Sequence, residues 1–250
     1  MDSLTVAAAS GMRARLESLE MLANNLANAA TAGYKSDREF YSLYVAPEAL
    51  NPALEGFGSA PATLPVIQGH WTDFYQGTLT PTGNPLDLAL SGKGFFAADG
   101  PGGQLYTRNG SLRLSPAGIL TTPEGYPLRT LERTPIQAQP GLPLEISTDG
   151  VVRQGGQALG QLAIVDFAQP AGLGKFGKNY FRAVDPRSVP QPAGGVEVHQ
   201  GKLESSNVGA PESAVRLISI LRQFEMLQKA MTIGADMGRR AVEEVARVTP

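Results

Sequence analysis

Apolar side chains recur with helical spacing near the start of the chain. They stand alternately four and three residues apart, at Met12, Leu16, Leu19, Ala23, Leu26 and Ala30. This is the heptad spacing of a coiled-coil seam. Asp2 or Ser3 can cap the beginning of such a helix, and Gly33 suits its end. The pattern predicts a helix over about residues 4–31, roughly 42 Å long.

The end of the chain repeats the pattern. The seam positions are Ala214, Leu217, Leu221, Phe224, Gln228, Met231, Ala235, Gly238, Val242 and Val245. Pro211 is suited to a first turn, and Glu212 to the positive end of the helix dipole. The pattern predicts a helix over residues 211–247, roughly 55 Å long.

Each predicted helix is apolar on one side only and therefore needs a partner. The nearest candidate is the other end of the chain. Because the first helix ends and the second begins next to the middle of the chain, we expect the two to run antiparallel. The alternative is two ordinary amphipathic helices packed on a globular body.

Turn residues divide the middle of the chain. Several Pro and Gly residues interrupt residues 36–70, which we therefore predict to be irregular. From residue 71 onward, short apolar runs alternate with turn signals such as Asn109-Gly110, as in an antiparallel β-domain. The fold class is then α+β, with the terminal helices forming an antiparallel coiled coil. The expected divisions are residues 1–35 (first helix), 36–70 (connection), 71–204 (β-domain) and 205–250 (second helix).

Composition narrows the classes of function. The formal net charge is −2 with both signs mixed, so nothing indicates nucleic-acid binding. The absence of cysteine excludes disulfides and Cys-ligated zinc. No apolar run reaches the roughly 18 residues that span a bilayer, so we expect no direct membrane insertion. The N-terminus also lacks the pattern of a classical signal peptide, and export would need another route.

Catalytic patterns are weak. The two histidines, His70 and His199, lack obvious carboxylate partners for a metal site. Gly92-Lys93-Gly94 lacks the spacing of a phosphate loop, and no Gly-x-Ser-x-Gly elbow is present. A glycosidase pair among the scattered carboxylates stays open, because their separation is a three-dimensional property. We therefore expect a protein that is not an enzyme, with no catalytic residues, metal or cofactor.

Three segments carry a resemblance to a known family. The first is LANNLANAATAGYK at residues 22–35. The second runs from DFYQG at 73–77 through GNPLDLAL at 83–90 and GKGFF at 92–96 to YTRNG at 106–110. The third is GKLESSNV at 201–208, followed by RQFE at 222–225. In this order, they resemble the axial proteins of the bacterial flagellum, meaning the rod and hook subunits.

The resemblance implies a structural role. Members of this family leave the cell unfolded through the flagellar type III export apparatus and assemble helically. Their terminal helices line the inner tube, their β-domains lie outside, and the axis transmits torque across the periplasm. The length and the start of this chain favour a rod protein of the proximal type over the distal type. The implied partners are other copies of the chain, other rod proteins and the export apparatus, in the rod of the basal body.

Several residues have two interpretations. Asn24, Asn25 and Asn28 either fray and cap the first helix or bond to neighbouring subunits, since Asn is a poor helix former. Lys35 is either a solvated charge or a contact between subunits. Arg108 and Asp87 either pair within the β-domain, the favoured structural role, or serve an interface. We expect at least one of Phe95 and Phe96 to lie in the core.

The residues expected at subunit interfaces come from both ends of the chain. They are Leu16, Leu19, Leu22, Asn24, Asn25, Leu26, Asn28, Lys35, Leu217, Leu221, Phe224 and Met231. Three rival functions stay open: an adaptor or cap protein of the same apparatus, a cell-wall hydrolase, and a soluble β-domain protein with incidental helices.

Overall fold

The computed structural model describes residues 3–45 and 63–248. The chain divides into two compact units. Unit 1 comprises residues 1–27, 37–71 and 209–250, and unit 2 comprises residues 28–36 and 72–208. Both ends of the chain therefore belong to one unit, and most of the middle forms the other.

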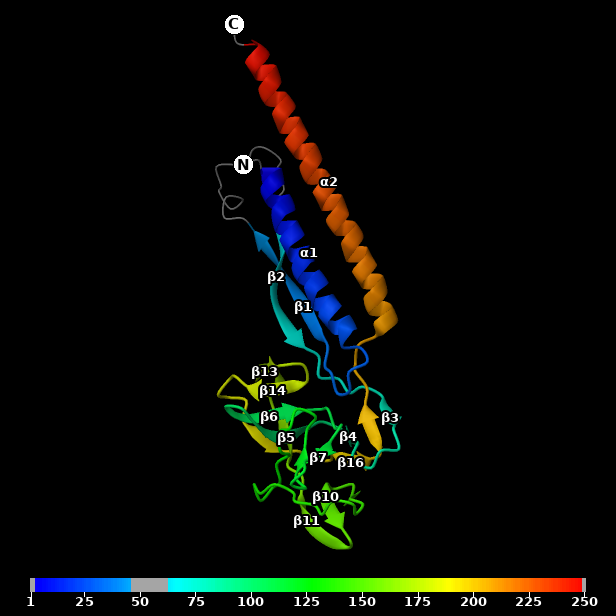
Figure 1. Cartoon of the computed structure of the whole chain (residues 1–250). Helices are drawn as coiled ribbons and strands as arrows, with labels where there is room; N and C mark the ends of the chain where they lie inside the picture. Colours follow the sequence, from blue (N-terminus) through cyan, green and yellow to red (C-terminus); the bar gives the residue numbers. More distant parts are fainter. Residues whose placement is uncertain (1–2, 46–62, 249–250) are drawn as a thin grey trace. The chain divides into compact units, whose positions relative to one another are not determined.

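Unit 1 contains both terminal helices. Helix α1 spans Ser3–Ala27 and helix α2 spans Ala210–Val248, so the predicted helices are confirmed with small shifts at their ends. Helix α1 stops earlier than expected because Asn28 begins a turn, in which Thr31 N donates to Asn28 O at 3.1 Å. The two helices lie side by side and run in opposite directions (Figure 1).

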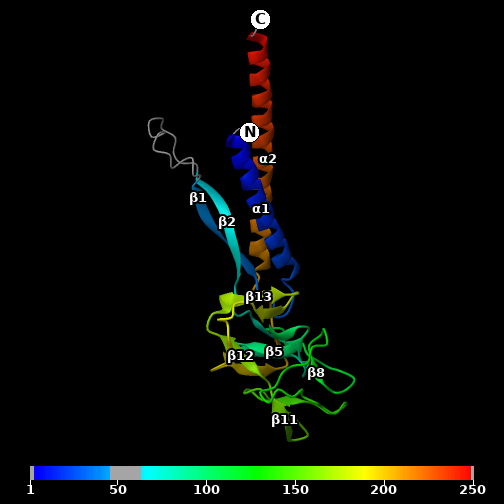
Figure 2. The same ribbon diagram turned by 90° about the vertical axis from the view of Figure 1, so that its left-hand side faces the viewer.

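A two-stranded sheet accompanies the helices in unit 1. Strand β1 spans Asp37–Val45 and strand β2 spans Thr63–Thr72 (Figure 2). The prediction of an irregular segment over 36–70 was therefore wrong in these two ranges, and residues 46–62 lie outside the described part. Most of the Pro and Gly residues that suggested irregularity fall between the strands rather than within them. Arg38 lies 5.9 Å from the centre of the Trp71 ring, linking the two strands.

Unit 2 is built from short strands. A six-stranded sheet has the order β13-β14-β6-β5-β12-β15, a three-stranded sheet the order β11-β10-β9, and three strand pairs are β16-β4, β17-β3 and β7-β8. The strands are β3 (Leu79–Pro81), β4 (Leu88–Ser91), β5 (Phe95–Gly100), β6 (Gly103–Thr107), β7 (Arg113–Leu114), β8 (Leu120–Thr121), β9 (Glu145–Ile146), β10 (Val151–Gln154), β11 (Gln157–Gln161), β12 (Ile164–Phe167), β13 (Leu173–Phe176), β14 (Tyr180–Ala183), β15 (Pro190–Pro192), β16 (Glu197–Gln200) and β17 (Lys202–Glu204). One short 3₁₀ helix, η3, spans Pro170–Gly172.

Neighbouring strands within these sheets are antiparallel. Together with the two helices, this confirms an α+β chain with mainly antiparallel strands.

Two apolar clusters form the core of unit 2. Phe96 is fully buried in one, with Leu88, Leu128 and Val152 among its neighbours. Phe95, the preceding residue, belongs to the other, where its ring meets that of Phe181 at 5.7 Å. Successive side chains of a strand point to opposite faces, so β5 contributes to both clusters. The prediction that Phe95 or Phe96 lies in the core is confirmed for both.

Deleting two methyl groups from the first cluster should measure its contribution. Val152 is fully buried and Val184 is 71% exposed, both in unit 2. We expect Val152→Ala to lower the free energy of unfolding by about 2 kcal/mol, because it removes buried apolar surface and leaves a cavity. The same change at Val184 should alter it by less than about 0.5 kcal/mol. Urea denaturation of both variants measures the difference, and equal losses would contradict the cluster as described.

Candidate functional site

Helix α1 buries a different side from the one that its apolar pattern predicts. Its buried side chains also recur at heptad spacing, at Ala14, Ser18, Met21, Leu22 and Asn25. Leu16, at the centre of the predicted seam, is 47% exposed, and Leu19 and Leu26 are half-buried. The predicted stripe therefore lies beside the covered face, where part of its apolar surface stays open.

Helix α2 has its covered face closer to the prediction. Leu217, Phe224 and Met231 are half-buried, and Ile220 is buried. Leu221 instead is 44% exposed. A Cβ atom at Gly11 of α1 would lie 3.5 Å from Leu227 Cδ1, which shows how closely the two helices approach.

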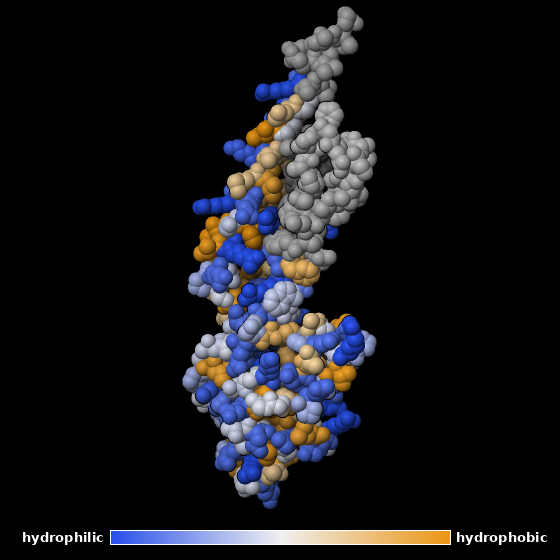
Figure 3. Space-filling model, turned by 180° about the vertical axis from the view of Figure 1, so that it is seen from behind, coloured by the Kyte–Doolittle hydropathy of each residue, from blue (hydrophilic) through white to orange (hydrophobic). Residues whose placement is uncertain are grey.

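A second apolar stripe follows the other side of α2. Its exposed members are Val215 (70%), Ile218 (54%), Met226 (63%), Ile233 (51%) and Met237 (66%). Val215, Ile218 and Met226, with Ser219, Arg222 and Gln223, line a groove of about 370 Å³. Apolar side chains alternate with polar ones along α2 in the surface view (Figure 3). Helix α2 thus carries an uncovered apolar surface, which we call the α2 stripe.

Glu39 joins the three parts of unit 1. Its carboxylate accepts a hydrogen bond from Ser18 Oγ of α1 at 2.6 Å and one from Arg216 Nη2 of α2 at 2.8 Å. Ser18 is fully buried, and the side chain of Glu39 is 1% exposed. A buried carboxylate needs such partners, so β1 fixes where both helices approach it.

The segments that resemble flagellar axial proteins are here called the signature segments. The three asparagines of the first one, residues 22–35, have different surroundings. Asn25 is buried, donates from Nδ2 to Asp37 O at 2.8 Å and accepts from Asp37 N at 3.0 Å. Its amide therefore serves the turn into β1 within the chain, and its contact with a neighbouring subunit stays a prediction. Asn28 is half-buried and accepts from Thr31 Oγ1 at 3.2 Å, whereas Asn24 is exposed.

Lys35 forms the centre of a buried polar cluster in unit 2. Its ammonium donates to Glu204 Oε1 at 2.5 Å and to Tyr75 O at 2.6 Å. The side chains of Lys35 and Glu204 are both 0% exposed. Burial lowers the pKa of Lys35, and the Glu204 carboxylate partly opposes that shift. The interpretation of Lys35 as a solvated charge was therefore wrong, whereas its contact with another subunit stays a prediction.

Arg108 is the third charged member of this cluster. Its Nη1 lies 3.4 Å from Glu204 Oε2, and its Nη2 donates to Gly92 O at 2.6 Å. Asp87 instead accepts from Asn84 Nδ2 at 3.0 Å, so the expected pair of Arg108 with Asp87 was wrong. Burial lowers the pKa of Arg108, against the raising effect of Glu204.

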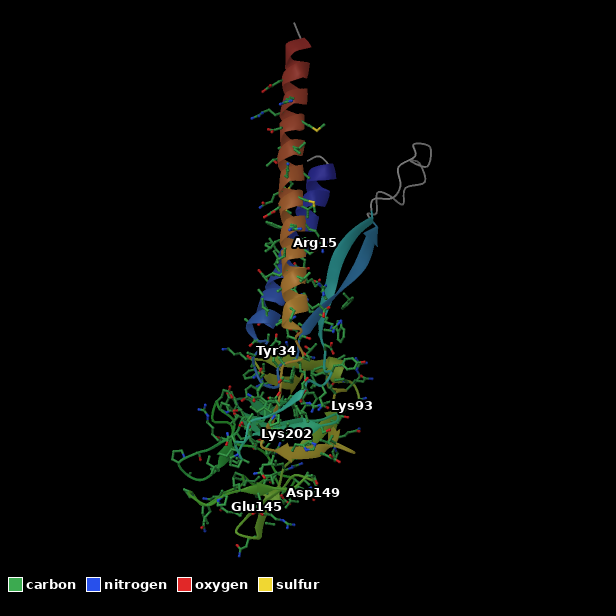
Figure 4. The ribbon with its side chains drawn as sticks, turned by 90° about the vertical axis from the view of Figure 1, so that its right-hand side faces the viewer. Arg15, Tyr34, Lys93, Glu145, Asp149 and Lys202 are labelled. Carbon is green, nitrogen blue, oxygen red and sulfur yellow. The ribbon has the colours of Figure 1, made fainter. Side chains whose placement is uncertain are left out.

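Backbone contacts bring the three signature segments together around this cluster. Gly33 N donates to Glu204 O at 2.7 Å, and Ser36 N donates to Asn207 Oδ1 at 2.7 Å. Asn207 Nδ2 in turn donates to Asp73 O at 2.7 Å. Lys175 of β13 donates to Lys35 O at 2.7 Å, and Figure 4 shows the neighbouring Tyr34 beside β13 and β14. The segments that resemble one family thus meet physically in unit 2.

Glu204 and Asn207 were missed as site residues. Both stand in the third signature segment, which is the sole signal that could have pointed to them. Lys35 and Glu204 are 169 positions apart, so no local pattern relates them.

The described residues offer little for metal or membrane binding. In residues 3–45 and 63–248, no group of three His, Cys, Asp or Glu side chains is placed to hold a metal ion. Within the same ranges, neither helix is long and apolar enough to cross a bilayer.

Comparison with protein families gives three matches along the chain. Residues 7–35 match the family described as "Flagella basal body rod protein". Residues 89–154 match the "Flagellar hook protein FlgE/F/G D1 domain", and residues 199–244 match the "Flagellar basal body rod FlgEFG protein C-terminal" family. The matches cover most of both helices and residues 89–154 of the β-domain.

Relatives extend the likeness over nearly the whole chain. The chain is 36% identical to the flagellar basal-body rod protein FlgF of Caulobacter vibrioides over 92% of each chain. It is also 36% identical to the rod protein FlgG of Agrobacterium fabrum, over 95% of this chain and 97% of the relative. The rod protein FlgG of Bacillus subtilis is 30% identical over 89% of this chain and 91% of its own length.

Proposed function

The chain belongs to the family of flagellar basal-body rod proteins, and we propose that it builds the rod by packing its terminal helices against those of other copies. It is a structural subunit of the flagellar basal body, and its family is not enzymatic. It assembles there with other rod components. Relatives that match more than nine-tenths of its length are named rod proteins, so the adaptor, cap, hydrolase and incidental-helix alternatives are not favoured.

The α2 stripe is the observation that carries the assembly proposal. Five large apolar side chains on one side of a helix are about half exposed or more, although burying each would contribute roughly 1.5–3 kcal/mol. Large apolar side chains that stay exposed along one side of a helix are typical of a contact with another protein. Within the assembled rod, the stripe packs against a helix of a neighbouring subunit.

The open side of α1 supplies a matching surface. Leu16, Leu19 and Leu26 keep part of their surface exposed at heptad spacing. In our proposal, these leucines of one copy pack between the members of the α2 stripe of the next copy. The contact joins two different surfaces, and when it repeats without closing into a ring it builds a helical filament. Leu217, Phe224 and Met231 then serve pairing within a subunit, and Leu221, on the edge, serves pairing between subunits.

Three finer features complete this proposal, the first from the heptad spacing and the other two from the family resemblance. The paired helices form an antiparallel coiled coil, the chain passes through the type III export apparatus before it folds, and it occupies the proximal part of the rod. The heptad spacing of the buried positions of α1 supports the first of these.

A charge placed on the α2 stripe tests assembly directly. We expect Ile218→Glu to lower incorporation into basal bodies at least tenfold, because a carboxylate in an apolar contact loses its hydration. Thr232→Glu introduces the same side chain at another exposed position of α2, outside the groove, and should assemble normally. Both variants would be expressed in a deletion strain, with swimming and the protein content of purified basal bodies measured. Normal rods containing a folded Ile218→Glu variant would contradict the proposal.

A further inference from the structure

We propose that the buried contacts of Lys35, Glu204 and Asn207, here called the junction clamp, prepare the terminal helices for pairing by joining the chain after α1 to the chain before α2. All three residues belong to unit 2, within its segments 28–36 and 72–208. This role is separate from assembly between subunits, because it acts within a single chain.

The clamp ties the two connecting segments directly to each other. Gly33 N donates to Glu204 O at 2.7 Å, and Asn207 N donates to Tyr34 O at 3.3 Å. The Lys35 ammonium and the Glu204 carboxylate add a side-chain bond at 2.5 Å. The Asn207 amide completes the link, since its Oδ1 accepts from Ser36 N at 2.7 Å. Backbone and side chains thus hold residues 33–36 beside residues 204–207.

A third segment, residues 73–77, also binds the residues of the clamp. Tyr75 O accepts from both Lys35 Nζ, at 2.6 Å, and Asn207 Nδ2, at 3.2 Å. Gly77 N donates to Glu204 Oε1 at 2.9 Å. The ammonium and the carboxylate have therefore exchanged their hydration for protein partners that come from three separate segments.

This arrangement makes the clamp depend on a folded unit 2. Both charged side chains are completely buried. A buried charge without its partners is strongly unfavourable, so the clamp is stable only when all three segments are in place. We infer that it forms together with the core of unit 2, as one cooperative step.

Forming the clamp shortens the loop of chain that must close before the two helices can meet. Lys35 and Glu204 are 169 positions apart, so in an unfolded chain the helix ends meet only by closing a very long loop. Once the clamp has formed, the last residue of α1 and the first residue of α2 are each only a few residues from a common point. Short tethers of this kind give effective concentrations in the millimolar range. Helices too weak to pair in an open chain can then pair within the monomer.

A cross-link between the helices would report on their pairing. The chain has no cysteine, and a Cβ atom placed at Gly11 would lie 3.5 Å from Leu227 Cδ1, so the two positions face each other. The full-length Gly11→Cys/Leu227→Cys variant would be treated with a short bifunctional maleimide at increasing urea, and the rate of intramolecular cross-linking measured. In parallel, hydrogen exchange at β5 and β6 would report the unfolding of unit 2. We expect both measurements to change at the same urea concentration.

Glu204→Gln in this background removes the charge that compensates Lys35. We expect it to move both midpoints to lower urea together, and to reduce cross-linking to the rate of the unfolded chain if unit 2 does not fold. Glu197→Gln is the matched control, because the Glu197 side chain is 65% exposed on β16, and it should move neither midpoint. The proposal is overturned if native cross-linking persists after unit 2 has unfolded. It is also overturned if Glu204→Gln leaves the cross-linking midpoint unchanged.

Discussion

Lys35→Met is expected to lower the free energy of unfolding of unit 2 by about 3–5 kcal/mol, because it leaves a buried carboxylate without its main partner. The Glu204 side chain is 0% exposed, and Arg108 Nη1 lies 3.4 Å from its other oxygen. The variant also removes the bond to Tyr75 O. Urea denaturation, followed by hydrogen exchange of β5 and β6, would measure the loss.

Two further variants separate charge from packing. Lys202→Met makes the same substitution at a half-buried position of β17 and should change stability by less than about 0.5 kcal/mol. Lys35→Met/Glu204→Gln removes both charges but keeps a side-chain oxygen beside Arg108 Nη1, and should recover part of the loss. A loss below about 1 kcal/mol in Lys35→Met would mean that Lys35 is not the partner that Glu204 requires.

Gly77→Ala is expected to destabilise unit 2 by about 3 kcal/mol through a steric clash with the backbone. A Cβ atom at this position would lie 2.0 Å from Ser205 O. The oxygen cannot move away freely, because Ser205 N donates to Thr78 O at 2.8 Å and Gly77 N donates to Glu204 Oε1 at 2.9 Å. The clash therefore either breaks these contacts or displaces the strand pair β3-β17.

Gly194→Ala is the matched control for this prediction. A Cβ atom at Gly194 meets no atom within 4 Å. There the methyl group should leave stability unchanged or raise it by about 0.4–1 kcal/mol, because it reduces the freedom of the unfolded chain. Thermal denaturation of both variants measures the contrast. Equal stability of Gly77→Ala and Gly194→Ala would show that the backbones at Gly77 and Ser205 do not approach as closely as described.

Local patterns determined the helices, the strand-rich middle and the aromatic core. Heptad spacing placed α1 and α2 within a few residues of their ends, since a helix needs little more than a consistent apolar period and suitable caps. The apolar run around Phe95 and Phe96 placed both residues in the core of unit 2. The three signature segments were enough to indicate the family, which the comparisons then gave independently.

The tertiary structure alone decided which surfaces and charges are covered. Apolar period gives the stripe of a helix but not its partner, so Leu22 and Asn25 of α1 are buried while Leu16 stays half exposed. Likewise, the many Pro and Gly residues of 36–70 led to the prediction of an irregular segment. Strands β1 and β2 form there because two separate segments pair with each other, which local composition does not record. Lys35 and Glu204 become partners only because the folded chain brings together positions 169 residues apart. Burial and pairing are properties of contacts between distant segments, whereas a sequence pattern records only what neighbouring residues favour.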